Sequence, residues 1–310
     1  MSDNKKTYYT SRTPSALYCK CNRARYLAYH HLDTGITKDS LYLPFVVGGA
    51  VHKGLETLLS DFIGVNELPD IHSPEFHTSV KKACESARGE FLTAIEGSPY
   101  DLTALDAKLA SQPKPAVNDP SAAIPSMEGA SDPRSEYILY LTEEQCALSE
   151  MLVATYAFSE QGLRLLLKEY EVLEVEQEDS FLLGETDEWQ LMWESRADGL
   201  LRRRTDDALV VLSFKTASKV DGRTTDSGES DMQGMSEVVS VEKRLHAYNH
   251  SKENQILPAW WVSAGGPTTV EAVQMIFLIK GSQKEDSKGR DLQENSLLRP
   301  WVRRGAFDEG

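Results

Sequence analysis

The sequence lacks any apolar run of the roughly 18 residues that a membrane-spanning helix needs. Its first residues, MSDNKKTYYT, also lack the apolar core of a signal peptide. Cysteine is scarce, and the four cysteines at positions 19, 21, 84 and 146 fit no zinc pattern of paired CxxC motifs. These absences exclude a membrane-spanning protein and a disulfide-stabilised scaffold, and they predict a cytoplasmic protein with free thiols.

Basic residues are in the minority, since 33 Lys and Arg stand against 48 Asp and Glu and the formal net charge is -15. This surplus of acid opposes nucleic-acid binding, because phosphate contacts depend on basic side chains. The charge is unevenly distributed, however. Residues 128–194 hold seventeen acidic and three basic residues, whereas residues 196–223 hold seven basic and four acidic ones. Segment 196–223 is therefore either a local basic face or a solvated face beside an acidic helix.

Composition divides the chain into four parts. Residues 1–110 are expected to be mainly helical. Residues 111–135 contain five prolines and few large apolar side chains, which is typical of a flexible insertion. Residues 136–281 are expected to form a core, and residues 282–310 a polar C-terminal tail.

Hydrophobic residues at helical spacing predict a helix that begins near Gly48. They are Val51, Leu55, Leu58 and Phe62. His52 and Glu56 are four residues apart, so both lie on one face of this helix beside the apolar stripe. A longer helix is expected from Thr142, where Gln145 completes a capping box, to about residue 170.

The pattern then changes from helix to sheet. Residues 191–204 and 207–215 are predicted to form two strands of a hairpin, joined by a tight turn at 205–207. Residues 269–281 alternate like a third strand, and a helix over 237–257 precedes it. Helices combined with these strands indicate an α/β protein.

The hairpin places polar side chains together. Ser213 and Lys215 share one face of their strand, and Asp198 comes close to both if the hairpin pairs as the turn suggests. An Asp and a Lys that converge at a hairpin are unusual, because neither side chain is readily buried. The residues alone leave two interpretations open: a functional site, or an exposed cross-strand ion pair.

Five motifs occur in a fixed order: SALYCKCNRARYLAYHHL (15–32), GGAVH (48–52), RADGLL (196–201), VVLSFKTAS (210–218), and Gln255 before Trp260. This order resembles the RecB-like branch of the PD-(D/E)XK nuclease superfamily over roughly residues 15–280. The resemblance implies a restriction-endonuclease-like core, a small mixed sheet flanked by helices, with a helical N-terminal region. The core would then be a nuclease-like core over residues 136–281.

Carried over by position, the resemblance implies His52, Asp198 and the backbone carbonyl of Phe214 as metal ligands. Lys215 would be the catalytic lysine beside Asp198, and Gln255 would help to hold the substrate or the site. The implied cofactor is Mg²⁺ or Mn²⁺, because oxygen ligands suit Mg²⁺ and a histidine ligand makes Mn²⁺ competitive. The implied function is exonuclease-like hydrolysis of DNA in recombination, repair or phage DNA processing, with DNA and a recombination protein as partners.

One position departs from the family pattern. Ser213 stands where the family has an acidic residue two positions before the lysine, and a hydroxyl is a poorer ligand for Mg²⁺ than a carboxylate. Three explanations remain open. The carboxylate has moved elsewhere, with Glu56 and Glu176 as candidates; or the protein binds DNA as a scaffold without cleaving it; or the serine is an inactivating substitution. Ser213 and Glu56 therefore join the candidate metal ligands.

A basic run follows Asp198. Arg202, Arg203, Arg204 and Lys219 are candidates for contacts with a phosphate backbone, although a run of charges beside a turn is an equal alternative. Related nucleases that carry an iron–sulfur cluster place three cysteines after the core, and this sequence has none after Cys146. No iron–sulfur cluster is therefore expected.

Overall fold

The computed structural model describes residues 5–11, 41–110, 133–217, 232–250 and 257–279, together with a few single positions between 15 and 28. The first motif (15–32) therefore lies largely outside the described residues, as do Lys219, Gln255 and the tail over 282–310. The expected insertion over 111–135 lies outside them up to residue 132, and its last residues open a helix at Pro133.

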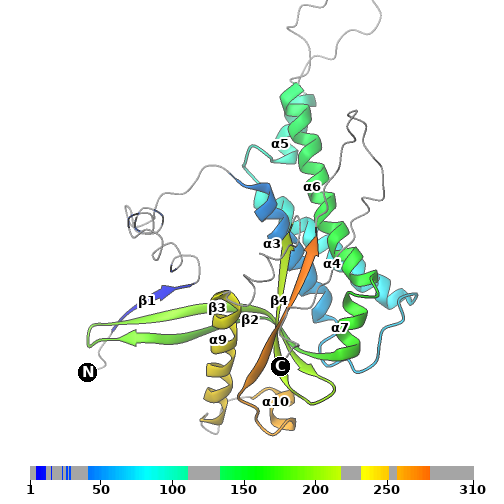
Figure 1. Ribbon diagram of the computed structural model, residues 1–310. Helices are drawn as coiled ribbons and strands as arrows, with labels where there is room; N and C mark the ends of the chain where they lie inside the picture. The colour runs from blue at the N-terminus through cyan, green and yellow to red at the C-terminus, as the bar shows by residue number, and fades with distance from the viewer. Residues whose placement is uncertain are drawn as a thin grey trace, which may run out of the picture.

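A mixed sheet of five strands forms the centre of the described chain (Figure 1). Its strands are β1 (Lys6–Thr10), β2 (Tyr170–Glu185), β3 (Trp189–Arg203), β4 (Leu209–Ala217) and β5 (Val270–Ile279). β3 pairs antiparallel with both β2 and β4, while the pairs β1–β3 and β4–β5 are parallel. The small mixed sheet flanked by helices and the α/β class are thus confirmed.

Along one edge of the long strand β3, a short stretch pairs with neither β1 nor β4, and this stretch is the gap in the edge of β3. β2 pairs with β3 from Gln190 to Arg203, so β1 and β4 both lie along the opposite edge. There β1 pairs with residues 189–193 and β4 with residues 199–202. Residues 194–198 lie between the two partners. Figure 1 shows the result, since β1, β2 and β3 extend as an arm while β4 and β5 turn away from it.

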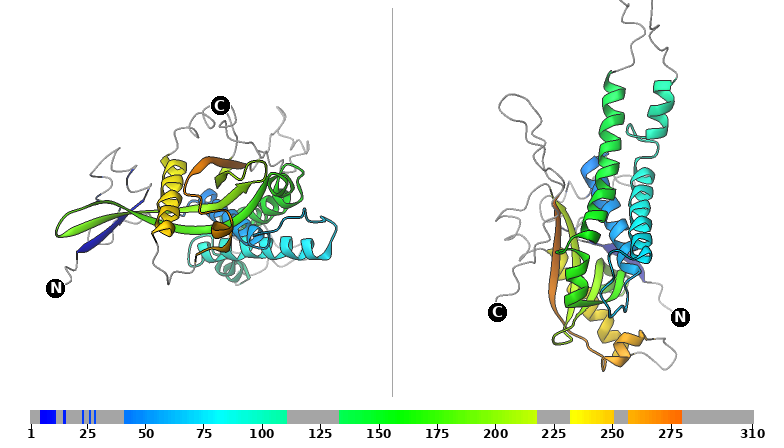
Figure 2. Two further views of the ribbon diagram at one scale, coloured as in Figure 1. Left: turned by 90° about the horizontal axis from the view of Figure 1, so that it is seen from below. Right: turned by 90° about the vertical axis from the view of Figure 1, so that its right-hand side faces the viewer.

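Four helices form a bundle on one face of the sheet, and a fifth lies beside them (Figure 2). They are α3 (Leu43–Ser60), α4 (Pro74–Ile95), α6 (Pro133–Phe158) and α7 (Leu163–Glu169), with α5 (Leu102–Ala110) against α6. The helix expected near Gly48 is α3, and its apolar stripe packs on β4. Leu55, Tyr156, Leu212 and Phe214 are among the fully or almost fully buried side chains of this core.

A second, smaller core lies on the other face of the sheet. It joins α9 (Met232–Asn249) and α10 (Ala259–Ser263) to β3, β4 and β5 through Leu200, Val211 and Leu245. α9 connects the parallel strands β4 and β5, as a crossover helix does. The helix expected over 237–257 is this helix, shifted toward the N-terminus.

The prediction of one long helix from Thr142 to about residue 170 is wrong at both ends. Thr142 lies inside α6 and donates its hydroxyl to the carbonyl of Ile138, so it is no N-cap. The helix also stops at Phe158 and α7 follows after a short turn. A Cβ at Gly162 would lie 2.0 Å from the carbonyl oxygen of Tyr156, so the turn admits only glycine.

The hairpin prediction is confirmed. β3 and β4 pair around a turn in which Arg203 N–H donates to Ala208 O, and the strand expected over 269–281 is β5. Residues 170–185, which the pattern assigned to no strand, form β2, and the sheet pairing of β2 determines where the functional side chains meet.

Candidate metal centre

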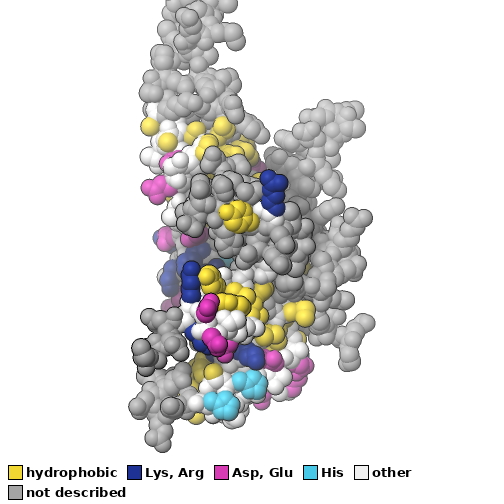
Figure 3. All heavy atoms as spheres, turned by 90° about the vertical axis from the view of Figure 1, so that its left-hand side faces the viewer, with side chains coloured by type: hydrophobic (Ala, Val, Ile, Leu, Met, Phe, Trp, Pro, Cys, Tyr) yellow, Lys and Arg dark blue, Asp and Glu magenta, His cyan; other side chains and the backbone are white. Residues whose placement is uncertain are grey.

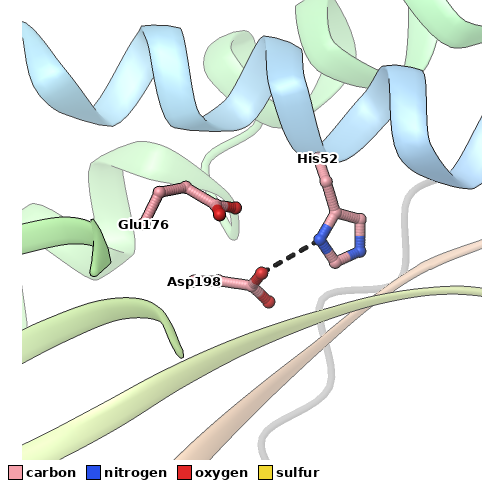
Figure 4. A group of neighbouring side chains, drawn as sticks. All are labelled: His52, Glu176 and Asp198. Carbon is pink, nitrogen blue, oxygen red and sulfur yellow. Dashed lines mark hydrogen bonds and ion pairs between the residues drawn. The ribbon is translucent and has the colours of Figure 1, made fainter. Parts of the chain in front are cut away.

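One histidine and two carboxylates converge beside the gap in the edge of β3. His52 on α3, Glu176 on β2 and Asp198 on β3 each present one ligand atom, and all three atoms lie within 4.8 Å of one another. Figure 4 shows the three side chains directed toward one space between α3 and the hairpin. Among the described residues, no other group of three or more His, Cys, Asp or Glu side chains is close enough to share a cation.

Asp198 is fixed from two sides. Its Oδ1 lies 3.0 Å from His52 Nδ1, and its Oδ2 accepts the backbone N–H of Phe214. The last β3–β4 pair in this direction is Gly199 with Leu212, so the carboxylate takes an N–H that the ladder no longer uses. The side chain is 10 % exposed. The strand that carries Lys215 therefore also holds Asp198 in place.

His52 is held against the same strand. Its ring meets the Phe214 ring edge-on, with 6.4 Å between centroids, and Phe214 packs in turn on Tyr156 at 5.5 Å. Gly48, one turn earlier on α3, would place a Cβ 3.2 Å from Thr216 Oγ1, which explains the small residue there. Burial lowers the pKa of His52, but the hydrogen bond and the charge of Asp198 outweigh it, so the net shift is upward.

Glu176 reaches the site through an unusual backbone. Val175 pairs with Gly199 and Gln177 with Ala197, so Glu176 stands opposite Asp198 on the neighbouring strand. Its φ is 50°, in the left-handed region that non-glycine residues rarely adopt. Such a conformation costs on the order of 1–3 kcal/mol and is concentrated at functional sites. The strained residue is the one that brings a second carboxylate to Asp198.

The two carboxylates repel each other. Burial, followed by the charge of Asp198, raises the pKa of Glu176 to about 7. Arg196 Nε lies 2.8 Å from Glu176 Oε2, but this ion pair lacks hydrogen-bond alignment, and the arginine side chain is 60 % exposed. The cluster thus concentrates negative charge that a buried cation would neutralise.

The other predicted metal ligands, Glu56, Ser213 and Phe214, differ from these three side chains in their contacts. Glu56 pairs with Lys53 Nζ at 2.7 Å and lies outside the three-atom cluster, although its charge raises the pKa of Glu176. Ser213 is fully buried, and its hydroxyl has no hydrogen-bond partner among the described residues. Phe214 contributes its N–H to Asp198, and a role for its carbonyl remains a prediction. Of the two candidates for a relocated carboxylate, the structure brings Glu176 to His52 and Asp198.

Lys215 lies close enough to act on the cluster. It is partly buried on β4, directly after Phe214, and its charge lowers the pKa of His52. Gln255 and Lys219 lie outside the described residues, so their predicted roles stay predictions.

The three arginines after Asp198 are engaged within the protein. Arg202 pairs with Glu171, and Arg203 with Asp206 and Glu271. Arg204 donates to three carbonyl groups and to Asn66. Among the described residues of the face in Figure 3, basic side chains are also scattered between acidic and hydrophobic ones. This arrangement favours the charge run beside a turn, and phosphate binding by these arginines stays a prediction.

Comparison of the sequence with protein-family models and with curated proteins finds no match. No helix in the described part of the chain has the length and apolar character needed to cross a bilayer.

The first prediction separates the two relocated-carboxylate candidates. Glu176→Gln should weaken Mn²⁺ binding, measured by calorimetry, by at least about tenfold, because it removes one of three ligands. Glu56→Gln is the matched control, and it should change the affinity little, because Glu56 lies outside the three-atom cluster and pairs with Lys53. The opposite ranking of the two variants would contradict this assignment.

The second prediction concerns pH. The pKa of Glu176 is raised to about 7, and burial raises the pKa of Asp179, which lies on β2 outside the cluster, to about 6. The folded protein without metal therefore binds protons more tightly than the unfolded chain. His52 is shifted in the same direction. The melting temperature without metal should therefore fall as the pH rises from about 5 to about 7.5, while the stabilisation by added Mn²⁺ grows over the same range.

Glu176→Gln should remove much of that pH dependence, because glutamine does not titrate. A melting temperature that rises with pH in the metal-free protein, or an Mn²⁺ effect that is equal at both ends of the range, would show that the cluster does not titrate in this way.

Proposed function

We propose that the protein is a metal-dependent DNA phosphodiesterase of PD-(D/E)XK type in which Glu176 replaces the carboxylate missing at Ser213. The single observation that carries the proposal is the convergence of His52, Glu176 and Asp198 within 4.8 Å. The order of the motifs along the sequence supports it, because two members of the cluster occupy positions that the family uses for metal ligands.

The residues fit a divalent cation. Two carboxylates and one imidazole form a donor set suited to Mn²⁺ and to Mg²⁺ with added water ligands. The mutual repulsion of Glu176 and Asp198 and the left-handed φ of Glu176 are unfavourable in the protein alone, and a cation would offset the repulsion. When bound, the metal would lower the pKa of a water molecule and neutralise phosphate charge.

The remaining chemistry falls to side chains of the site. His52, Glu176 and Asp198 would hold the ion, and the Phe214 N–H keeps the Asp198 carboxylate in a fixed orientation. Lys215 supplies a positive charge beside the cluster, suited to stabilising negative charge that develops on the attacked phosphate.

A second candidate function is a nuclease-fold scaffold that binds DNA without cleaving it. Position 213 favours this alternative, because a fully buried hydroxyl without a described partner supplies no carboxylate. Both candidates place DNA on the protein, and they differ in whether the cluster is catalytic.

The third prediction tests the role of Ser213 through cleavage of linear DNA with Mg²⁺ or Mn²⁺. Ser213→Ala should leave cleavage nearly unchanged and should not lower the free energy of unfolding, because it removes a buried hydroxyl that lacks a described partner. Ser213→Glu should leave activity level or lower it, because a third carboxylate would crowd Glu176 and Asp198.

Three outcomes decide between the candidates. Loss of cleavage in Asp198→Ala and in Glu176→Gln, with DNA binding retained, supports the enzyme. A gain of about tenfold or more in Ser213→Glu would mean that Glu176 does not fill the missing role. Absence of cleavage by the wild type and by Ser213→Glu, with DNA binding retained, would leave the scaffold.

A further inference from the structure

The face of α3 that bears His52 continues toward the start of the helix as an exposed stripe. Phe45, Gly49, His52 and Glu56 are spaced by three or four residues, so they follow one another along one side of the helix. Phe45 is 79 % exposed, and Tyr42 beside it is 59 % exposed. Their rings meet edge-on with 5.0 Å between centroids. An aromatic platform thus stands in solvent on the side of the helix that leads to the metal centre.

Gly49 is the only one of three glycines in α3 that the packing of the described residues does not explain. A Cβ at Gly54 would lie 2.6 Å from Val153, and one at Gly48 would crowd Thr216. At Gly49, which is exposed, a Cβ would meet nothing within 4 Å. A glycine inside a helix is unfavourable relative to alanine. Close approach of a ligand to the bare helix backbone is a physical reason for glycine at such a position.

This part of the stripe holds no carboxylate that would repel a polyanion. The first turn of α3 contains no acidic residue. Glu56, the acidic member of the stripe, lies beyond His52 and pairs with Lys53. A chain of phosphates that ran from Phe45 to His52 would therefore meet no carboxylate of α3.

We propose that the segment from Tyr42 to His52 binds single-stranded DNA, with a base stacked on Phe45 and the sugar–phosphate chain passing over Gly49 to the cluster. Stacking on an exposed aromatic ring requires an unpaired base, because bases in a duplex are already stacked. Seven residues at 1.5 Å each separate Phe45 from His52 by about 10 Å along the helix axis, so a base stacked on Phe45 and a phosphate at the cluster would belong to the same short stretch of strand. This proposal rests on the proposed function and adds the substrate class.

The fourth prediction tests the aromatic platform. Fluorescein-labelled oligothymidylate is titrated with protein in Ca²⁺, which occupies oxygen-rich sites, and binding is followed by anisotropy. Phe45→Ala should weaken binding by about 5- to 150-fold, the range of one base–aromatic stack. Phe45→Trp should bind about as well as the wild type. Tyr140→Ala is the matched control, because Tyr140 is 65 % exposed on α6, and it should bind normally.

The role of Gly49 is tested with a second glycine of the same protein as the control. Gly89 on α4 is also an exposed helical glycine at which a Cβ would meet nothing within 4 Å, so Gly89→Ala controls for Gly49→Ala. Each alanine should raise the melting temperature by about 2 °C, because alanine favours a helix. Only Gly49→Ala should weaken oligothymidylate binding. A more stable protein with weaker binding cannot be ascribed to misfolding.

The two proposals fail separately. If Phe45→Ala and Gly49→Ala bind oligothymidylate like their controls, the single-strand site is overturned even where Asp198 is needed for cleavage. If the wild type shows no cleavage but both variants lose binding, the single-strand site stands and the nuclease assignment fails. Equal binding of a blunt duplex with the same dependence on Phe45 would also overturn the single-strand site.

Discussion

The bond from the Phe214 N–H to the Asp198 carboxylate lies where β4 leaves β3, and the rest of the site depends on it. This bond fixes the Asp198 carboxylate beside the gap in the edge of β3, between β1 and β4. The same strand brings Phe214 against the ring of His52, and Lys215 close enough to influence its charge. One short segment of β4 therefore positions three side chains. It holds Asp198 by a hydrogen bond and His52 by ring packing, and it carries Lys215 as the residue after Phe214.

The second constraint is electrostatic. Glu176 faces Asp198 across neighbouring strands, in a left-handed conformation and with its pKa raised to about 7 by burial and by that neighbour. Position 213 meanwhile carries a small, fully buried hydroxyl. A carboxylate supplied by β2 thus accompanies a small neutral side chain at position 213 of β4.

Local patterns along the sequence encode part of this site. The hairpin of β3 and β4 follows from alternation around a turn, and helical spacing places His52 beside the apolar stripe of α3. These patterns do not predict β2. YEVLEVEQEDSFLLGE is rich in glutamate, which disfavours strands, and the pairing with β3 shifts register after Val172. The φ of Glu176 depends on that tertiary pairing, so a pattern along the chain names Glu176 as a candidate but cannot choose it over Glu56.

The central claim is that Glu176, and neither Ser213 nor Glu56, completes a cation site with His52 and Asp198. The most direct measurement is anomalous diffraction from a crystal of the protein soaked in Mn²⁺. We expect one strong anomalous peak in contact with all three side chains, and the Arg196–Glu176 ion pair opened. A peak that contacts Asp198 together with Ser213 or Glu56, while Glu176 remains on Arg196, would contradict the account, as would the absence of any peak at Asp198.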